Sequence, residues 1–376
     1  MASPIKLENL EIRQFRTFDH LVVERLGQVN LFVGKNNVGK STILEALWLY
    51  ANLGSPRILR EILQAHDEAI EYPQGECGIR GGGEPSVCSL FHDRPKIGQF
   101  DSTIEIGPIN APDSSLRITI ARVHRKKAAA EQSVSSAEGP TEFHDLYEED
   151  IPALIVKIGS LQRMMMLDED FEVHARRWEL QPRSMLELTI NSVFVGPNGL
   201  APREMENLWR QVVLTELERD VIDSMRIISP EVDDFAVLST NSSGYPTVRL
   251  KTERSATPVP LRSLGDGMNR LFGIGMALVN SQNGILLVDE IENGLHFSIL
   301  PSLWKYILKV ARRLNVQVFA SSHSYECIKA FYAAAREDTS IDGVLNRVEF
   351  VNDEYRSAVF DEDRLNTVLG ENIEIR

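Results

Sequence analysis

Cysteine is scarce in this chain of 376 residues, which contains only Cys77, Cys88 and Cys327. These residues form no CxxC pair, so the sequence predicts neither a disulfide framework nor a zinc module. Long apolar runs are also missing, because the most continuous one, residues 271–279, is well short of the roughly 20 residues that a membrane helix needs. Residues 1–13 lack the pattern of a secretory signal. We therefore expect a cytoplasmic protein without membrane insertion.

Positive charge is in deficit, since 40 Lys and Arg residues face 54 Asp and Glu residues and the formal net charge is −14. This balance opposes binding of a polyanion over a broad surface. A basic stretch within residues 117–127 leaves local contact with nucleic acid open as one alternative. Such stretches are more often solvated strand ends. Hydrophobic residues make up 43% of the chain, which is enough for a large core in one or two domains.

Periodicity and turn residues indicate where strands and helices form. Strands are expected at residues 6–14, 29–33, 103–106, 116–123, 153–158, 185–195, 235–238, 247–250, 284–288 and 316–321. Helices are expected at residues 41–52, 268–279 and 297–313, and one long helix at residues 203–227. Residues 126–140 have the composition of a mobile hairpin tip. The order strand, helix, strand near the C-terminus predicts a parallel sheet and an α/β fold.

Residues 34–41 read GKNNVGKS and fit the phosphate-loop pattern GxxxxGK[ST] in full, between an expected strand and an expected helix. The two glycines allow the backbone N–H groups to point at phosphate oxygens, and the start of the helix adds its positive dipole end. We expect Lys40 to reach the β and γ phosphates and the Ser41 hydroxyl to bind Mg²⁺. The candidate nucleotide-binding residues of this segment are Gly34, Asn36, Asn37, Val38, Gly39, Lys40, Ser41 and Thr42.

The expected strand at residues 284–288 ends in two adjacent carboxylates, Asp289 and Glu290. Because side chains alternate along a strand, the two carboxylates cannot do the same work. Asp289 is suited to hold Mg²⁺ through a water molecule, and Glu290 to polarise the water that attacks the γ-phosphate. No NKxD segment of the kind that reads guanine occurs in the chain. We therefore expect adenine as the base, and ATP with Mg²⁺ as the cofactors.

The pentapeptide SLGDG at residues 263–267 precedes an expected helix. A serine and two glycines at a helix start can form a second anion-binding terminus, although a plain helix cap is the ordinary interpretation of such a segment alone. The candidate nucleotide-binding residues here are Ser263, Gly265, Asp266 and Gly267.

His323 follows the strand expected at residues 316–321, at the sheet edge where the other motifs gather. A lone histidine is usually structural. The order phosphate loop, SxGxG, Asp-Glu and His is nevertheless hard to obtain by accident. We therefore expect Lys40, Glu290 and His323 to act in catalysis.

This order of motifs resembles ABC-type ATPase heads, and more narrowly the SMC, RecF and OLD (overcoming lysogenization defect) group. Residues 12–18, IRQFRTF, resemble the strand and turn that open such heads, and by this resemblance Arg13 and Arg16 contact the nucleotide. Residues 289–296, DEIENGLH, look like OLD-like AAA ATPases and unlike transporter heads. The resemblance covers residues 6–50 and 260–325. The C-terminal residues also look like the end of a stand-alone member of the group.

The resemblance implies a P-loop NTPase fold of ABC type, with an antiparallel β lobe and an inserted region of helices and strands. The ATPase core would consist of residues 1–55, with the phosphate loop, and residues 256–376, with the signature, the Walker B strand and the His switch. Residues 56–255 would form the inserted lobe. In such heads the signature caps the γ-phosphate held by a second subunit, so the resemblance implies a homodimer with ATP sandwiched between its subunits.

Some features depart from the family pattern. Asp266 stands where transporter heads have a second glycine. The glutamine of the Q-loop stays open among Gln64, Gln74 and Gln99. Too few residues follow His323 for the Toprim nuclease domain of full-length OLD proteins. We therefore expect an effector, such as a nuclease, to be a separate chain.

These features favour an ATPase that works as a dimeric switch and controls a partner effector or nucleic-acid engagement, in bacterial anti-phage defence or DNA maintenance. The alternative is the ATP-binding subunit of an ABC membrane transporter, since such subunits carry no membrane span. The SxGDG signature and the ENGLH continuation speak against it. A third interpretation keeps nucleotide binding as an assembly cue without turnover, and the intact Glu290 argues against that.

Overall fold

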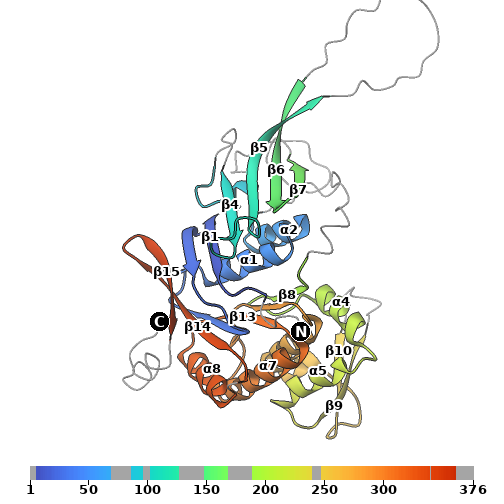
Figure 1. Ribbon diagram of the computed structural model, residues 1–376. Helices are drawn as coiled ribbons and strands as arrows, with labels where there is room; N and C mark the ends of the chain where they lie inside the picture. The colour runs from blue at the N-terminus through green and yellow to red at the C-terminus, as the bar shows by residue number, and fades with distance from the viewer. Residues whose placement is uncertain are drawn as a thin grey trace, which may run out of the picture.

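The computed structural model describes residues 6–68, 86–95, 102–126, 148–167, 189–238, 247–338 and 340–360 of the chain. Within these residues, one mixed sheet of six strands forms the centre and an antiparallel sheet of six strands lies beyond it, with a three-stranded sheet to one side (Figure 1). This arrangement confirms the expected α/β fold with an antiparallel β lobe. No helix of the described residues is long and apolar enough to cross a membrane.

The central sheet consists mainly of parallel strands buried on both faces. Its order is β15 (Glu354–Phe360), β14 (Gly343–Val351), β3 (Val29–Val33), β13 (Gln317–Ser322), β12 (Ile285–Val288) and β8 (Ser192–Val195). Neighbouring strands run parallel except at the edge, where β14 and β15 are antiparallel. Every residue of β3, β12 and β13 is buried, as is usual for parallel strands covered by helices. The carboxyl ends of these three strands meet at one edge, where the phosphate loop, Asp289 and His323 follow them.

Helices cover both faces of the central sheet. They are α1 (Lys40–Ala51), α2 (Pro56–Ala65), α6 (Asp266–Asn280), α7 (Leu300–Leu314) and α8 (Tyr325–Glu337), with the short 3₁₀ turns η1 (Ser86–Leu90) and η4 (Phe297–Ile299). α1 packs on the face that carries Leu287 and Phe319, in the same core as the antiparallel sheet. α6, α7 and α8 pack on the opposite face, with Leu286 and Val318. α1 is therefore enclosed between two sheets, which explains why it is apolar nearly all round.

The antiparallel sheet forms a lobe over α1 (Figure 1). Its order is β2 (Phe18–Val23), β1 (Leu10–Phe15), β4 (Thr103–Gly107), β5 (Leu116–Lys126), β6 (Glu148–Ile158) and β7 (Leu161–Met166). Alternate residues such as Ile12, Ile104 and Ile118 are fully buried in the core that contains α1. One face of the sheet is therefore apolar, as expected for an antiparallel sheet covered on one side.

A third group of elements packs beside α6. It consists of α4 (Pro202–Val212), α5 (Leu217–Arg226), β9 (Val232–Leu238), β10 (Thr247–Thr252), β11 (Val259–Pro260) and the 3₁₀ turn η3 (Leu261–Leu264). The prediction of one long helix over residues 203–227 is wrong, because α4 and α5 are separate. Leu214 adopts φ of +63° between them, and Glu218 Oε2 accepts a hydrogen bond from its N–H at 3.3 Å. α5 therefore begins as a new helix at Leu217, after the N-cap residue Glu216, although the apolar spacing continues through the break.

The sequence did not reveal α2 and α8. Pro56 is the first residue of α2, where its missing N–H costs nothing, and Ser324 caps α8 by accepting a hydrogen bond from the Cys327 N–H at 3.3 Å. The hairpin tip expected over residues 126–140 lies outside the described residues except at Lys126. The expected domain limits stay a prediction. In the structure, β1 and β2 belong to the lobe sheet, and β8 joins the central sheet.

Candidate active site

The phosphate loop connects β3 to α1 through two glycines in the left-handed region. Gly34 has φ of +151°, and a Cβ there would lie 2.3 Å from the carbonyl oxygen of Val348. Gly39 has φ of +91°, and a Cβ there would lie 2.4 Å from Cζ of Phe18. Gly39 is also the N-cap of α1, where no side chain caps the helix. The first N–H groups of α1 are therefore available to an anion.

The other loop residues hold the loop in shape or face outward. Val38 is buried in the core beneath the loop, whereas Asn36 and Asn37 are exposed, and Asn37 adopts φ of +64°. Asparagine tolerates this conformation better than most residues. Ser41 and Thr42 lie in the first turn of α1. The curled loop predicted from the sequence thus has a buried anchor and an exposed rim.

Lys40 is buried at the start of α1 and points back across the loop. Its Nζ donates hydrogen bonds to the carbonyl oxygens of Gly34 at 2.9 Å and Lys35 at 2.8 Å. Burial lowers the pKa of Lys40, while the nearby carboxylates of Asp289, Glu290 and Glu292 act in the opposite direction. An ammonium group has three hydrogens, so one donor remains for a phosphate oxygen.

Asp289 and Glu290 follow β12 and face different surroundings. Asp289 is buried, and its Oδ1 accepts a hydrogen bond from the Ser321 hydroxyl at the end of β13. The same hydroxyl accepts a hydrogen bond from the Glu290 N–H at 2.8 Å. Glu290 adopts φ of +47°, a costly conformation for a residue with a side chain, and its side chain is 38% exposed. Ser321 therefore fixes both carboxylate residues at once.

Glu292 joins the end of β12 to the end of β13. Its Oε1 accepts hydrogen bonds from the Ser322 hydroxyl at 2.8 Å and from the N–H groups of His323 at 3.1 Å and Ser324 at 3.2 Å. Nδ1 of His323 lies 3.6 Å from Glu292 Oε1 and 3.8 Å from Glu290 Oε1. Glu292 thus positions His323 between two carboxylates, a role that the sequence pattern did not reveal.

Arg270 ties α6 to the segment that follows β12. Its guanidinium donates to the carbonyl oxygens of Asp289 at 2.6 Å and Glu290 at 2.9 Å, and on its other side to that of Gly196 at 2.6 Å. Burial lowers the pKa of Arg270 to about 10, against the opposing effect of Asp289, Glu292 and Glu290, so the group stays charged at neutral pH. A sequence signal existed, because Arg270 is the one basic residue in the apolar helix Asp266–Asn280.

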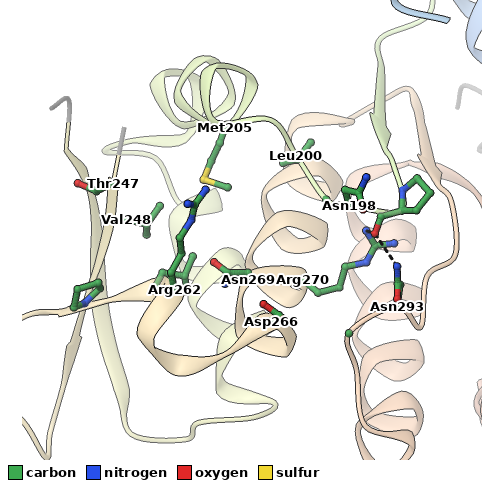
Figure 2. Close-up of a pocket in the computed structure, with 15 residues that line it drawn as sticks. Asn198, Leu200, Met205, Thr247, Val248, Arg262, Asp266, Asn269, Arg270 and Asn293 are labelled. Carbon is green, nitrogen blue, oxygen red and sulfur yellow. Dashed lines mark hydrogen bonds between the residues drawn. The ribbon is translucent and has the colours of Figure 1, made fainter. Parts of the chain in front are cut away.

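The start of α6 borders a cavity of about 890 Å³ (Figure 2). Asp266, Asn269 and Arg270 contribute to its wall from the helix, and Asn293 from the segment after Walker B, where its side chain donates to the carbonyl oxygen of Pro197 at 3.1 Å. Gly265, with φ of +94°, is the N-cap of α6, and no side chain caps this helix. The first N–H groups of α6 therefore lie beside this cavity, where an anion could reach them.

The structure gathers some of the candidate residues and leaves others apart. The carboxyl edge of the central sheet brings together Lys40, Asp289, Glu290 and His323. The carboxylates of Asp289 and Glu290 act electrostatically on Lys40. Nδ1 of His323 lies 3.8 Å from Glu290 Oε1. Ser263 is exposed in η3, one turn before α6.

Arg13, on β1, and Arg16, just after it, make ion pairs with nearby carboxylates. Arg13 lies 2.6 Å from Glu11 on β1, and Arg16 is bound by Glu68 at 3.0 Å and approached by Glu45 of α1 at 3.4 Å. Contact of either arginine with a nucleotide therefore stays a prediction. Gln64 is exposed at the end of α2, and Gln74 and Gln99 lie outside the described residues.

The residues suited to Mg²⁺ fit the ion's preference for oxygen. The Ser321 hydroxyl fixes Oδ1 of Asp289, which orients the carboxylate. The described part of the chain contains no group of three or more His, Cys, Asp or Glu residues arranged to hold a metal ion by themselves. Mg²⁺ commonly binds through one or two protein oxygens together with phosphates and water, which is the donor set that Ser41 and Asp289 supply.

Two family models match this chain. The family model "AAA ATPase domain" matches residues 5–104, which contain the phosphate loop. A second model, described as "AAA domain, putative AbiEii toxin, Type IV TA system", matches residues 172–328, which contain the signature, Asp289, Glu290 and His323. Both models describe AAA-type ATPase domains, and together with the phosphate loop they support an ATP-hydrolysing enzyme of the P-loop type. In this ATPase the two matched regions meet at the carboxyl edge of the central sheet, where the phosphate loop, Asp289 and His323 lie.

The chain is also similar to individual proteins, in sequence or in fold. A Helicobacter pylori protein named ATP/GTP phosphatase is 22% identical over 344 residues, covering 88% of this chain and 89% of that one. An uncharacterised protein of Methanocaldococcus jannaschii is 45% identical over 96 residues, or 24% of this chain and 37% of that one. A solved SMC head, bound to the C-terminal winged-helix domain of ScpA, has a TM-score of 0.50 at 12% identity, covering 95% of this chain and 99% of that one.

Replacing Arg270 with Met is expected to destabilise this ATPase by about 3 kcal/mol, because carbonyl groups bonded to a buried charge would lose their donor. ATP hydrolysis should fall as well, since Glu290 would lose one of the groups that hold its backbone. Thermal unfolding followed by circular dichroism measures the first effect. The exposed neighbour Arg262, changed to Met, serves as the control. An unchanged Tm for Arg270→Met would show that the tether contributes nothing.

Proposed function

We propose that this ATPase is a dimeric switch, in which two chains enclose two ATP molecules and hydrolysis releases them. The observation that supports it most directly is the pair of uncapped helix starts. α1 follows the phosphate loop, and α6 follows the signature. Each chain thus offers two anion-binding termini, and a two-fold symmetric pair of chains can use all four on two nucleotides.

In the proposed site, the phosphate loop and Lys40 hold the β and γ phosphates of ATP. The Ser41 hydroxyl and Asp289 would hold Mg²⁺, which when bound would neutralise charge that develops on the phosphate oxygens. The hydrogen bond from Ser321 keeps Asp289 oriented, and burial keeps water from competing for it. Lys40 is already placed by its bonds to the loop carbonyls. Binding therefore requires little reordering of these side chains.

Glu290 is the proposed group that orients the attacking water. The water oxygen forms a bond to the γ-phosphorus, the bond to the leaving ADP oxygen breaks, and Glu290 accepts the proton of the water. His323, whose Nδ1 lies 3.8 Å from Glu290, can contact the γ-phosphate from the other side of the same edge. The Glu290 carboxylate lies beside His323 and is partly exposed, whereas Asp289 is buried against Ser321. One carboxylate is thus kept for the metal and one for water.

The signature is the proposed surface for the partner's nucleotide. The start of α6 is exposed, uncapped and bordered by the cavity of Figure 2, so another chain can approach it. Leu264 is 39% exposed beside Gly265, which adds apolar surface to this approach. ATP would then contribute contacts to both chains and favour the dimer by mass action.

A separate effector is the proposed target of the switch. The family model that matches residues 172–328 names a toxin of a toxin–antitoxin system, which supports a role in bacterial defence. The solved SMC head is bound to a domain of another protein, which supports control of a partner chain. We favour a nuclease as the effector. Nucleic acid would then bind to that effector or to this chain.

Replacing Ser263 with Arg is expected to abolish ATP-dependent dimers while ATP binding to one chain is unchanged. The new side chain places bulk at the start of α6, where the partner's γ-phosphate would dock. Light scattering with ATP and Mg²⁺, in chains that also carry Glu290→Gln, measures the dimer. Ser114→Arg makes the same change at an exposed turn of the lobe and is the control. If Ser263→Arg chains dimerise as the control does, the signature does not serve a partner.

A further inference from the structure

The hairpin of β14 and β15 extends past the end of β3 and lies along the phosphate loop. The last pair between β14 and β3 joins Arg347 to Val33, whereas β14 continues to Val351. Val348, the next residue after that pair, places its carbonyl oxygen where a Cβ on Gly34 would stand, at 2.3 Å. The loop and the hairpin therefore leave no space between them at Gly34.

Three aromatic side chains pack in series beside this contact between the hairpin and the phosphate loop. Phe350 pairs across the hairpin with Tyr355, and their ring centroids are 4.6 Å apart. Tyr355 meets Phe18 edge-on at 5.0 Å, and Phe18 lies against Gly39 at the other end of the phosphate loop. We call Phe18, Tyr355 and Phe350 the aromatic platform. It connects to both glycines of the loop, one through Phe18 and the other through the backbone of Val348.

The aromatic platform faces the same side of the sheet as the loop. Side chains alternate along β14, so Phe350 points to the side of Val348, which is buried in the core that contains Phe18 and Val38. Phe18 is fully buried and Tyr355 is partly buried, but Phe350 is 51% exposed. The aromatic platform thus has a buried base and one open ring at the rim of the nucleotide site.

We infer that the aromatic platform holds the purine base of the bound nucleotide, with Phe350 stacked on it. The inference rests on the proposed binding of ATP phosphates by the loop. The base is covalently joined to those phosphates, so it must lie within the length of one nucleotide from α1. Aromatic rings stack on every base because every base has a π-face. Stacking alone does not distinguish bases by their hydrogen-bonding groups, so adenine and guanine should both stack on Phe350.

A comparison of nucleotide with bare phosphate tests the inference. Phe350→Leu keeps an apolar side chain but removes the ring, and Phe350→Tyr keeps the ring. We expect Phe350→Leu to weaken binding of a non-hydrolysable ATP analogue roughly ten-fold and to leave the affinity for inorganic tripolyphosphate unchanged, because tripolyphosphate has no base. Phe350→Tyr should bind both as wild type does. Val351→Ala, on the opposite face of the same strand, is the matched control.

The outcomes separate this inference from the proposed function. If wild type binds the ATP analogue and Phe350→Leu binds it equally well, the aromatic platform does not hold the base, while the nucleotide site stands. Equal weakening of the analogue and of tripolyphosphate would mean that the substitution disturbs the loop, which also overturns the inference. Wild type that binds neither compound would overturn the proposed nucleotide site itself. Titration calorimetry supplies all of these affinities.

Discussion

Chains in which Glu290 is replaced by Gln are expected to bind ATP and to hydrolyse it at least about a hundred-fold more slowly than wild type. A general base typically contributes on the order of 10² to 10⁴ to the rate, and an amide cannot accept the proton of the attacking water. Gln keeps the size of Glu, so the backbone at φ of +47° and its hydrogen bond to Ser321 should persist. Phosphate release in single turnovers measures the rate.

The same substitution is expected to accumulate the dimer, because the ATP that joins the chains would not be consumed. Size-exclusion chromatography with ATP and Mg²⁺ measures this. Glu337→Gln, on the exposed face of α8, removes one carboxylate far from the sheet edge and serves as the control. Hydrolysis at the wild-type rate by Glu290→Gln chains would assign the base to another residue, and Glu292 would then be the first to test.

Replacing Lys40 with Ala is expected to weaken ATP binding by about 10- to 150-fold or more. Loss of one hydrogen bond to a charged group is worth about 1.5 to 3 kcal/mol, and the loop would also lose the two bonds that hold Lys40 across it. The fold should stay intact, because burial already disfavours the ammonium, as the lowered pKa of Lys40 indicates. Titration calorimetry measures the affinity, and thermal unfolding checks the fold.

Lys329→Ala on α8 is the matched control, since it removes an exposed lysine from the opposite face of the central sheet. It should bind ATP as wild type does. Lys40→Ala chains with unchanged ATP affinity would show that the phosphate loop of residues 34–41 does not bind the nucleotide.

Local sequence patterns predicted the parts of the site that depend on neighbours in the chain. The phosphate loop needs Gly34 and Gly39 at fixed spacing between a strand and a helix, and residues 29–51 contain all of this information. Asp289 and Glu290 were identifiable because an apolar strand that ends in carboxylates has few structural uses. The β lobe, in contrast, was predicted through its resemblance to a family rather than from spacing.

Contacts between distant segments could not be predicted in the same way. Ser321 and Glu292 act because the ends of β12 and β13 lie side by side, and nothing in either segment specifies that its hydroxyl or carboxylate meets the other. The aromatic platform likewise joins β2 to the end of β14, which lie far apart in the sequence. The break at Leu214 was missed for another reason, because apolar spacing continues through it while only Thr215 and Glu218 mark a new start.

The tether at Arg270 has a consequence for a pair of chains. In the proposed dimer, α6 of one chain faces the nucleotide of its partner, whereas Glu290 of that same chain faces its own nucleotide, and one guanidinium holds both segments. A shift of α6 at one nucleotide therefore moves the backbone of Glu290 at the other. The two ATP molecules are then thermodynamically linked, and by reciprocity each changes the affinity for the other by the same factor. The dimer would bind and release its nucleotides as a cooperative unit.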